Sequence, residues 1–279
     1  MAVAAALPLF LQGDNARLQR LCDALYRYLF FFGRWDDRQA LDLRAEERAV
    51  AASDVDNAGW RAYSAGSVYH LRGQAAETLA CAHRAKVYWT NSGTRERAYA
   101  IWLSGLGHKL TKDYSAAIGA LQEAVDLYRM LAPRGLGVAR GLDSLGLVES
   151  LAGDYVAAER DLREALQIAR EANHREYIAD FTGDLADVAL DHQDWPAAET
   201  LAREALPLAE ALGRQEMIAL DCYRIARSLV RQNRQAEGLP YAQRAVEIFA
   251  KLRSRHLENA QAVLKECEKA ATDEKRMIR

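Results

Sequence analysis

The sequence of 279 residues lacks the features that mark several large classes of protein. It has 5 prolines, 4 cysteines and no apolar run of about 18 residues or more. A membrane-spanning helix needs about 20 such residues, so we predict no membrane association. The 37 basic and 39 acidic side chains nearly cancel. This balance excludes a broad basic surface of the kind that binds nucleic acid, and we predict no such partner.

The residues that are abundant favour helices. Half of the chain is hydrophobic, which is too much for a disordered protein. We count 52 alanines and 36 leucines, so nearly a third of the residues are strong helix formers. Residues that favour strands are scarce by comparison. The composition therefore predicts an all-α protein.

The four cysteines are far apart in the sequence and form no C-x-x-C motif. They are Cys22, Cys81, Cys222 and Cys267. This distribution argues against a disulfide framework and against a zinc site. We expect reduced, mostly buried thiols in a cytoplasmic protein.

A short turn motif of three residues recurs along the chain. We call its third residue, which is aromatic in four of the six copies, the anchor. Its copies are Gly33-Arg34-Trp35, Gly73-Gln74-Ala75, Lys112-Asp113-Tyr114, Gly153-Asp154-Tyr155, Gln193-Asp194-Trp195 and Asn233-Arg234-Gln235. The anchors at 35, 75, 114, 155, 195 and 235 are spaced by 40, 39, 41, 40 and 40 residues. A fixed period of this length is typical of repeat architectures.

Small residues follow the same period. An alanine stands ten residues after every anchor, at positions 45, 85, 124, 165, 205 and 245. Nine residues before the anchor the series is Tyr26, Gly66, Gly105, Gly146, Ala186 and Ala226. Three residues after it the series is Arg38, Thr78, Ala117, Ala158, Ala198 and Gly238. Small side chains let two helices approach closely, so each unit is predicted to be a hairpin of two packed helices.

The fourth unit illustrates the predicted hairpin. Its helices are expected at about 137–152 and 155–171, on either side of the Gly-Asp-Tyr turn. Gly93, Gly135 and Gly213 stand where second helices should end, and we predict that they are C-terminal caps. One hairpin cannot bury its apolar face alone, but a stack of hairpins can.

This pattern resembles the tetratricopeptide repeat (TPR) family, over about residues 16–255. The resemblance implies a right-handed superhelical α-solenoid of about six hairpins, and it is strongest in the three middle units. The period of 40 exceeds the usual period of about 34, and we expect the extra residues at the junctions between units. Residues 256–273 are predicted to form a capping helix, 1–15 a leader or linker, and 274–279 a charged tail.

The long repeats also resemble the C-terminal sensor region of bacterial STAND signalling ATPases. The stretches 18–35 (LQRLCDALYRYLFFFGRW) and 57–73 (NAGWRAYSAGSVYHLRG) carry this resemblance. It implies an upstream nucleotide-binding domain in a longer parent chain. No G-x-x-x-x-G-K-[ST] motif is present here.

Motifs for catalysis, metals or cofactors were sought and not found. Gly135-Leu136-Gly137 imitates a dinucleotide loop, but it follows a helical stretch and not a strand. The six histidines are scattered, and no two stand four residues apart. We therefore predict a non-enzymatic protein with no catalytic residue, no metal site and no cofactor.

The resemblance to the TPR family also implies where a ligand binds. The first helix of each hairpin lines a concave groove, through positions 15, 12, 8 and 5 residues before the anchor. The candidates that we select from these positions are Trp60, Tyr63, Tyr99, Trp102, Lys109, Arg140, Asp143, Asp180, Asp187, Tyr223 and Arg227. The N-terminal part of this groove is aromatic and the C-terminal part is charged. Such a groove suits an extended peptide or an amphipathic helix.

Two interpretations of the aromatic residues stay open at this stage. They either contact a ligand or pack against neighbouring first helices. The leading hypothesis is a protein- or peptide-binding sensor domain of a larger signalling ATPase. The alternative is a regulator or scaffold complete in itself that responds to a peptide. An unrecognised enzyme would need detectable ATP hydrolysis, and an RNA reader would need a basic groove.

Overall fold

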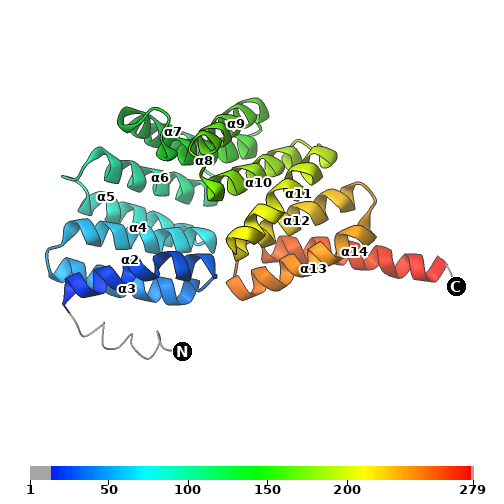
Figure 1. Ribbon diagram of the computed structural model, residues 1–279, viewed down its shortest axis with the longest axis horizontal. Coiled ribbons are helices and arrows are strands. Elements are labelled where there is room, and N and C mark those ends of the chain that lie inside the picture. The colour runs from blue at the N-terminus through cyan, green and yellow to red at the C-terminus, as the bar shows by residue number, and fades with distance from the viewer. Residues whose placement is uncertain (1–13, 278–279) are drawn as a thin grey trace. The chain divides into compact units, whose positions relative to one another are not determined.

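The computed structural model describes residues 14–277, and all regular structure within them is α-helical (Figure 1). The helices are α2 (Asn15–Phe31), α3 (Trp35–Ala51), α4 (Val55–Leu71), α5 (Ala75–Tyr88), α6 (Thr94–Leu110), α7 (Tyr114–Leu131), α8 (Leu136–Ala152), α9 (Tyr155–Glu171), α10 (Arg175–Asp191), α11 (Trp195–Leu212), α12 (Gln215–Arg231), α13 (Gln235–Leu252) and α14 (Leu257–Met277). The expected leader, 1–15, lies almost entirely outside the described residues. The predicted all-α fold is confirmed.

The chain forms two compact units, which are described separately. The first extends to Leu127 and contains α2 to α6 with most of α7, and the second begins at Tyr128. Within each unit, consecutive helices pack in antiparallel pairs, and alternate helices also touch: α4 with α6, and α8, α10, α12 and α14 in series. This two-layer arrangement is that of a helical-repeat solenoid.

The turn inside each hairpin has the same backbone conformation in every repeat. The residue two positions before each anchor has a positive φ: Gly33 (68°), Gly73 (73°), Lys112 (60°), Gly153 (92°), Gln193 (63°) and Asn233 (60°). Each anchor is then the first residue of the second helix. A left-handed residue reverses the chain and ends the first helix, so the 40-residue period is a structural period.

The junctions between hairpins are less regular. Ser53, Asn173, Gly213 and Arg253 each end a second helix with a positive φ, and this confirms the cap predicted at Gly213. The caps predicted at Gly93 and Gly135 are wrong, because these glycines begin α6 and α8 with φ of −68° and −82°. In both places the preceding helix ends earlier, and a short loop separates it from the glycine.

The predicted close helix crossings are confirmed. All six alanines that stand ten residues after an anchor are fully buried, as are Ala117, Ala158 and Ala198. A Cβ on Gly146 would lie 2.9 Å from the carbonyl oxygen of Ala158, and one on Gly105 would lie 2.7 Å from Leu121. The two helices of a hairpin therefore approach too closely at this point for a side chain.

The first hairpin breaks this pattern in two positions that touch each other. Tyr26 replaces the small residue before the anchor, and Arg38 replaces the alanine after it. The Arg38 guanidinium lies 4.2 Å from the centre of the Tyr26 ring and 4.7 Å from that of Phe30. It also donates to Ser64 Oγ at 2.8 Å and faces Asp42 at 3.6 Å. The two substituted residues therefore contact each other across α2 and α3, with Arg38 buried and the Tyr26 ring partly exposed.

The second unit ends in α14, which covers most of the range 256–273 where a capping helix is expected. On α14, Val263 and Cys267 are buried in a cluster with Ala226, Val230 and Ala242 of α12 and α13. Residues 274–277 of the expected charged tail belong to this helix.

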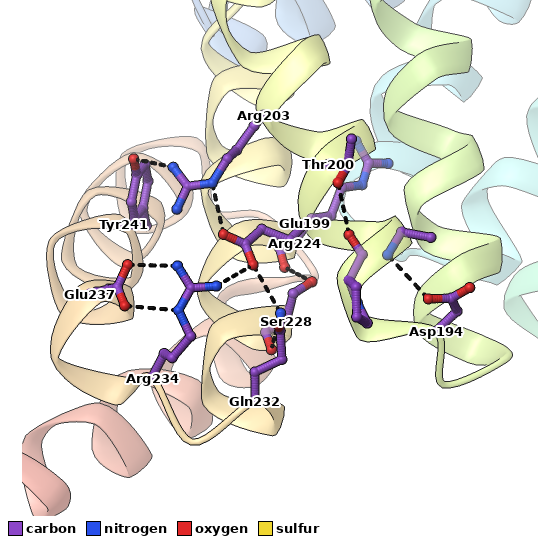
Figure 2. A network of polar contacts seen from close by, with 12 residues as sticks. Asp194, Glu199, Thr200, Arg203, Arg224, Ser228, Gln232, Arg234, Glu237 and Tyr241 are labelled. Atoms are coloured by element: carbon purple, nitrogen blue, oxygen red, sulfur yellow. Dashed lines mark hydrogen bonds and ion pairs between the residues drawn. The ribbon is translucent and has the colours of Figure 1, made fainter.

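A polar network joins α11, α12 and α13 (Figure 2). Glu199 of α11 accepts hydrogen bonds from Arg203 at 2.9 Å, from Gln232 at 2.9 Å and from Arg234 at 2.7 Å. Arg203 also donates to Tyr241 Oη on α13 at 2.9 Å. Because Glu199 accepts bonds from both sides of the α12–α13 turn, the network fixes α11 against the next hairpin.

Candidate functional site

The four aromatic residues predicted in the groove of the first unit come together. Trp60 and Tyr63 lie on α4, and Tyr99 and Trp102 lie on α6. The Trp60 and Tyr99 ring centres are 5.0 Å apart, those of Tyr63 and Tyr99 5.1 Å, and those of Tyr63 and Trp102 6.1 Å. Trp60, Tyr99 and Trp102 are half-buried, whereas Tyr63 is buried. The rings therefore pack on neighbouring first helices and still present a partly exposed surface.

A fifth ring completes this aromatic cluster, and the sequence analysis missed it. Trp89, directly after α5, is fully buried, and its centre lies 5.1 Å from that of Trp60. Its indole crosses α4 at Gly59, where a Cβ would lie 2.2 Å from the indole nitrogen. The same nitrogen donates to the Asp56 carbonyl at 3.3 Å. The sequence held one signal for this contact: relative to the anchor Ala75, Trp89 stands 14 residues later and Gly59 stands 16 residues earlier.

Two pockets adjoin Trp60 in the first unit. One, of about 780 Å³, lies between the start of α4, the end of α5 and the start of α6. The other, of about 450 Å³, lies between α2 and α4 and is lined by Asp23, Tyr26, Asn57, Trp60, Arg61, Tyr63 and Ser64. Because Trp60 lines both, its side chain is the wall that the two pockets share.

Arg61 and Ser64, which line the smaller pocket, also contact the buried Asp42. Arg61 contacts Asp23, which is largely exposed, and lies 3.5 Å from the buried carboxylate of Asp42. Ser64 donates a hydrogen bond to the same carboxylate. Burial raises the pKa of Asp42 from its usual range, while Arg38 and Arg61 act in the opposite direction. These contacts hold the α4 residues of the pocket in one arrangement.

Lys109, the remaining candidate of the first unit, stands near the other end of α6 and is half-buried. It lies seven residues beyond Trp102, about two helical turns away. It does not line either pocket at Trp60.

In the second unit, the candidate residues of α8 are engaged within the protein. Arg140 donates a hydrogen bond to Tyr128 Oη, and its guanidinium lies 5.4 Å from the centre of the same ring. Asp143, one turn further along α8, is buried. Neither side chain stands isolated in an open groove.

Asp187, one of the two charged candidates on α10, belongs to a largely buried network centred on a residue that the sequence did not reveal. Arg224 of α12 is buried and donates to Asp187 at 2.6 and 3.0 Å and to Asp184 at 2.5 Å. It also donates to Asp221 at 2.8 Å. Burial raises the pKa of Asp221 to about 7, although Arg224 lowers it in part. Asp187 therefore serves first as a partner of Arg224.

The other candidates of this network lie at its margin. Burial raises the pKa of Asp180, and the neighbouring Arg214 opposes this effect. Burial likewise raises the pKa of Tyr223, and Arg227, which hydrogen-bonds to its hydroxyl, opposes it. Asp180, Asp187 and Arg227 therefore each lie beside a polar side chain of the protein itself.

Among the side chains that the structure describes, no group of three His, Cys, Asp or Glu residues could hold a metal ion. Within residues 14–277, no helix is both long enough and apolar enough to cross a membrane.

Comparison with known proteins identifies the repeat and the fold. Residues 137–211 match the family model "Tetratricopeptide repeat". No curated protein matches the chain. A Rap protein complexed with Competence and Sporulation Factor is similar in structure, with 14% identity, a TM-score of 0.66, and coverage of 94% of this chain and 77% of that one.

Two further solved structures are similar. For the apo form of RapI, the TM-score is 0.55 at 15% identity, over 90% of this chain and 100% of that one. For the aspartyl phosphate phosphatase F from Bacillus subtilis, the TM-score is 0.56 at 14% identity, over 88% and 70% of the two chains. At such identities the likeness concerns the fold. The chain is therefore an all-α helical-repeat protein whose residues 137–211 carry the tetratricopeptide repeat.

Proposed function

We propose that this protein is a non-enzymatic binding solenoid that holds a peptide or a protein segment against the aromatic cluster of the first unit. The observation that carries the proposal is the position of Trp60, which lines both pockets. Half-buried aromatic side chains are frequent binding hot spots, since they bury a large area and lose little conformational entropy. Here the neighbouring rings already restrain Trp60 before a ligand arrives.

The likeness in fold supports this proposal. The similar Rap protein was solved in complex with Competence and Sporulation Factor, so a solenoid of this kind accommodates a bound factor. The present chain keeps the repeated hairpins over most of the same length. It also places the rings of Trp60, Tyr63, Tyr99 and Trp102 on adjoining first helices.

The charged candidates have a secondary place in this proposal. Arg140 and Asp187 already have partners within the chain, and a ligand would have to share or replace those contacts. Breaking a buried charge pair is costly. We therefore assign the main binding energy to the aromatic cluster. Lys109, Asp143, Asp180, Tyr223 and Arg227 remain candidates for peripheral contacts.

We infer two possible settings for the same binding activity, and each names a different partner. In the first, the chain is the sensor part of a bacterial signalling ATPase, and its partner is an upstream nucleotide-binding domain of the same parent protein. The support is the sequence resemblance of residues 18–35 and 57–73. In the second, it is a regulator that responds to a peptide, as the fold shared with Rap proteins suggests. The reading frame upstream of this sequence distinguishes the two.

A capture experiment tests the binding surface. An array of peptides is probed with the wild type, with a Trp60→Ala/Trp102→Ala variant, and with Tyr28→Ala as the control. Tyr28 is an exposed aromatic of the same unit that lines neither pocket. We expect the double variant to lose most captured peptides while the control keeps them, with circular dichroism showing that both are folded. Equal capture by all three proteins would show that the ligand binds elsewhere.

A further inference from the structure

The larger pocket lies at a junction that departs from the repeat. Helix α5 has 14 residues, whereas the second helices α3, α9, α11 and α13 have 17 or 18. The short connection after each of these helices contains one residue with positive φ. Helix α5 instead ends at Tyr88, and residues 89–93 form a loop before α6. The missing turn leaves space above the first turns of α4 and α6. We call this space the α5–α6 pocket.

The lining of the α5–α6 pocket combines apolar walls with negative charge. It includes Val55, Asp56, Trp60, Val87, Ser92 and Glu96. Val55 and Val87 are about half exposed, an uncommon state for valine, at 52% and 54%. The lining holds two carboxylates and no lysine, arginine or histidine.

The carboxylates outweigh the positive ends of the two helices. The start of an α-helix is equivalent to about half a positive charge, and α4 and α6 both begin here. Asp56 and Glu96 lie in their first turns and contribute two negative charges. Together the two helix starts and the two carboxylates give the pocket a net charge of about −1. Ser92 Oγ donates to Asp56 Oδ1 at 3.1 Å, which ties the loop to α4.

We propose that the α5–α6 pocket is a subsite for a basic side chain, arginine or lysine, of the bound peptide. The alkyl part of such a side chain packs on Val55 and Val87, and its cation reaches Asp56 and Glu96 beside the Trp60 indole. Long basic side chains bury their stems and keep their charge near water, which suits an open pocket with acidic groups. Aromatic walls favour cations further. This inference rests on the proposed binding function and specifies the chemistry of the ligand.

A selection experiment tests this subsite. Random 12-residue peptides are selected by display against the full chain at low salt. We expect the enriched peptides to share an arginine or lysine at one position. Synthetic copies are then measured by fluorescence anisotropy, with that arginine either kept or replaced by citrulline, which has a similar shape and no charge. Citrulline should weaken binding to the wild type about five- to tenfold.

Matched variants assign the effect to the pocket. In Asp56→Asn/Glu96→Gln, the arginine and citrulline peptides should bind with equal affinity. Glu77→Gln is the control, because Glu77 occupies the same position in the first turn of α5 as Glu96 does in α6 and lies outside the pocket. It should keep the full preference for arginine.

The possible failures are distinguishable. Selected peptides without a shared basic residue, or a preference for arginine that survives in the double variant, would overturn the subsite and leave the binding function intact. If no peptide is enriched on the wild type, the proposed peptide-binding function fails, and the subsite fails with it.

Discussion

Three residues after the anchor, the three middle repeats have alanine and the first repeat has Arg38. We predict that replacing Arg38 by alanine destabilises the first unit. Arg38 is only 2% exposed. Its guanidinium donates to Ser64 Oγ at 2.8 Å, faces Asp42 at 3.6 Å and covers the Tyr26 ring at 4.2 Å. Alanine would keep none of these contacts and would leave a space beside Tyr26. The substitution that a repeat consensus recommends is therefore unfavourable here.

The magnitude follows from the contacts that remain. Removing one partner of a buried ion pair costs about 3–5 kcal/mol. We take the lower end, because Arg61 stays 3.5 Å from Asp42 and Ser64 still donates to that carboxylate. Loss of the stacking on Tyr26 adds about 1 kcal/mol. The expected loss in free energy of unfolding is therefore about 4 kcal/mol.

Urea unfolding at neutral pH, followed by circular dichroism, measures this loss. Amide hydrogen exchange in α2, α3 and α4 locates it in the first unit. The control is Arg34→Ala, which removes an exposed ion pair with Asp37 and should cost less than about 1 kcal/mol. If Arg38→Ala is as stable as the wild type, the buried contact does not stabilise the hairpin, and the reasoning is refuted.

The same variant has a predicted pH dependence. Burial already raises the pKa of Asp42 above its unfolded value, and without Arg38 this pKa rises further. An acid with a raised folded-state pKa destabilises the fold when ionised and is relieved when it takes up a proton. The deficit of Arg38→Ala should therefore shrink as the pH falls towards the ordinary pKa of an aspartate, about 4. A deficit that grows on acidification would contradict this explanation.

Two further predictions concern the second unit and the glycines. Gly146→Ala should destabilise by about 1–3 kcal/mol, because its Cβ would lie 2.9 Å from the Ala158 carbonyl, whereas Gly119→Ala, with open space on α7, should stabilise by about 1 kcal/mol. Thermal melts compare the two, and equal shifts would argue against the close crossing. Burial raises the pKa of Asp221 to about 7 despite Arg224, so the wild type should gain stability as the pH falls from about 8 to about 5. Asp221→Asn should remove this contribution, which is at most about 1.4 kcal/mol per pH unit. Urea titrations at several pH values test this, and an unchanged slope would refute it.

The hairpins could be predicted because their determinants are local and repeated. The left-handed residue stands two positions before each anchor, and the alanine ten positions after it is buried in every repeat. Six copies of the same local requirement make the pattern visible in one sequence. By contrast, Gly93 and Gly135 were assigned to the wrong helix ends. Glycine suits either end, and the preceding helix decides which.

Part of the candidate site could also be predicted. The period brought Trp60, Tyr63, Tyr99 and Trp102 to neighbouring helices, where their rings meet. Trp89 was missed, because its contact depends on the glycine opposite it on α4. Such compensations join residues some 30 positions apart, and no local pattern reveals them.

The sequence by itself determined the helices, their pairing in hairpins and the small residues at their crossings, since these depend on periodicity and on the size of single side chains. Only the tertiary structure decided how charges and pockets are arranged. Asp187 and Arg140 were candidates for an open groove, yet packing pairs them with Arg224 and Tyr128. A shortened α5 opens a pocket beside Trp60. Burial, pKa and pocket shape depend on which side chains are in contact. In a helical-repeat protein many of these contacts join residues about one repeat apart in the sequence.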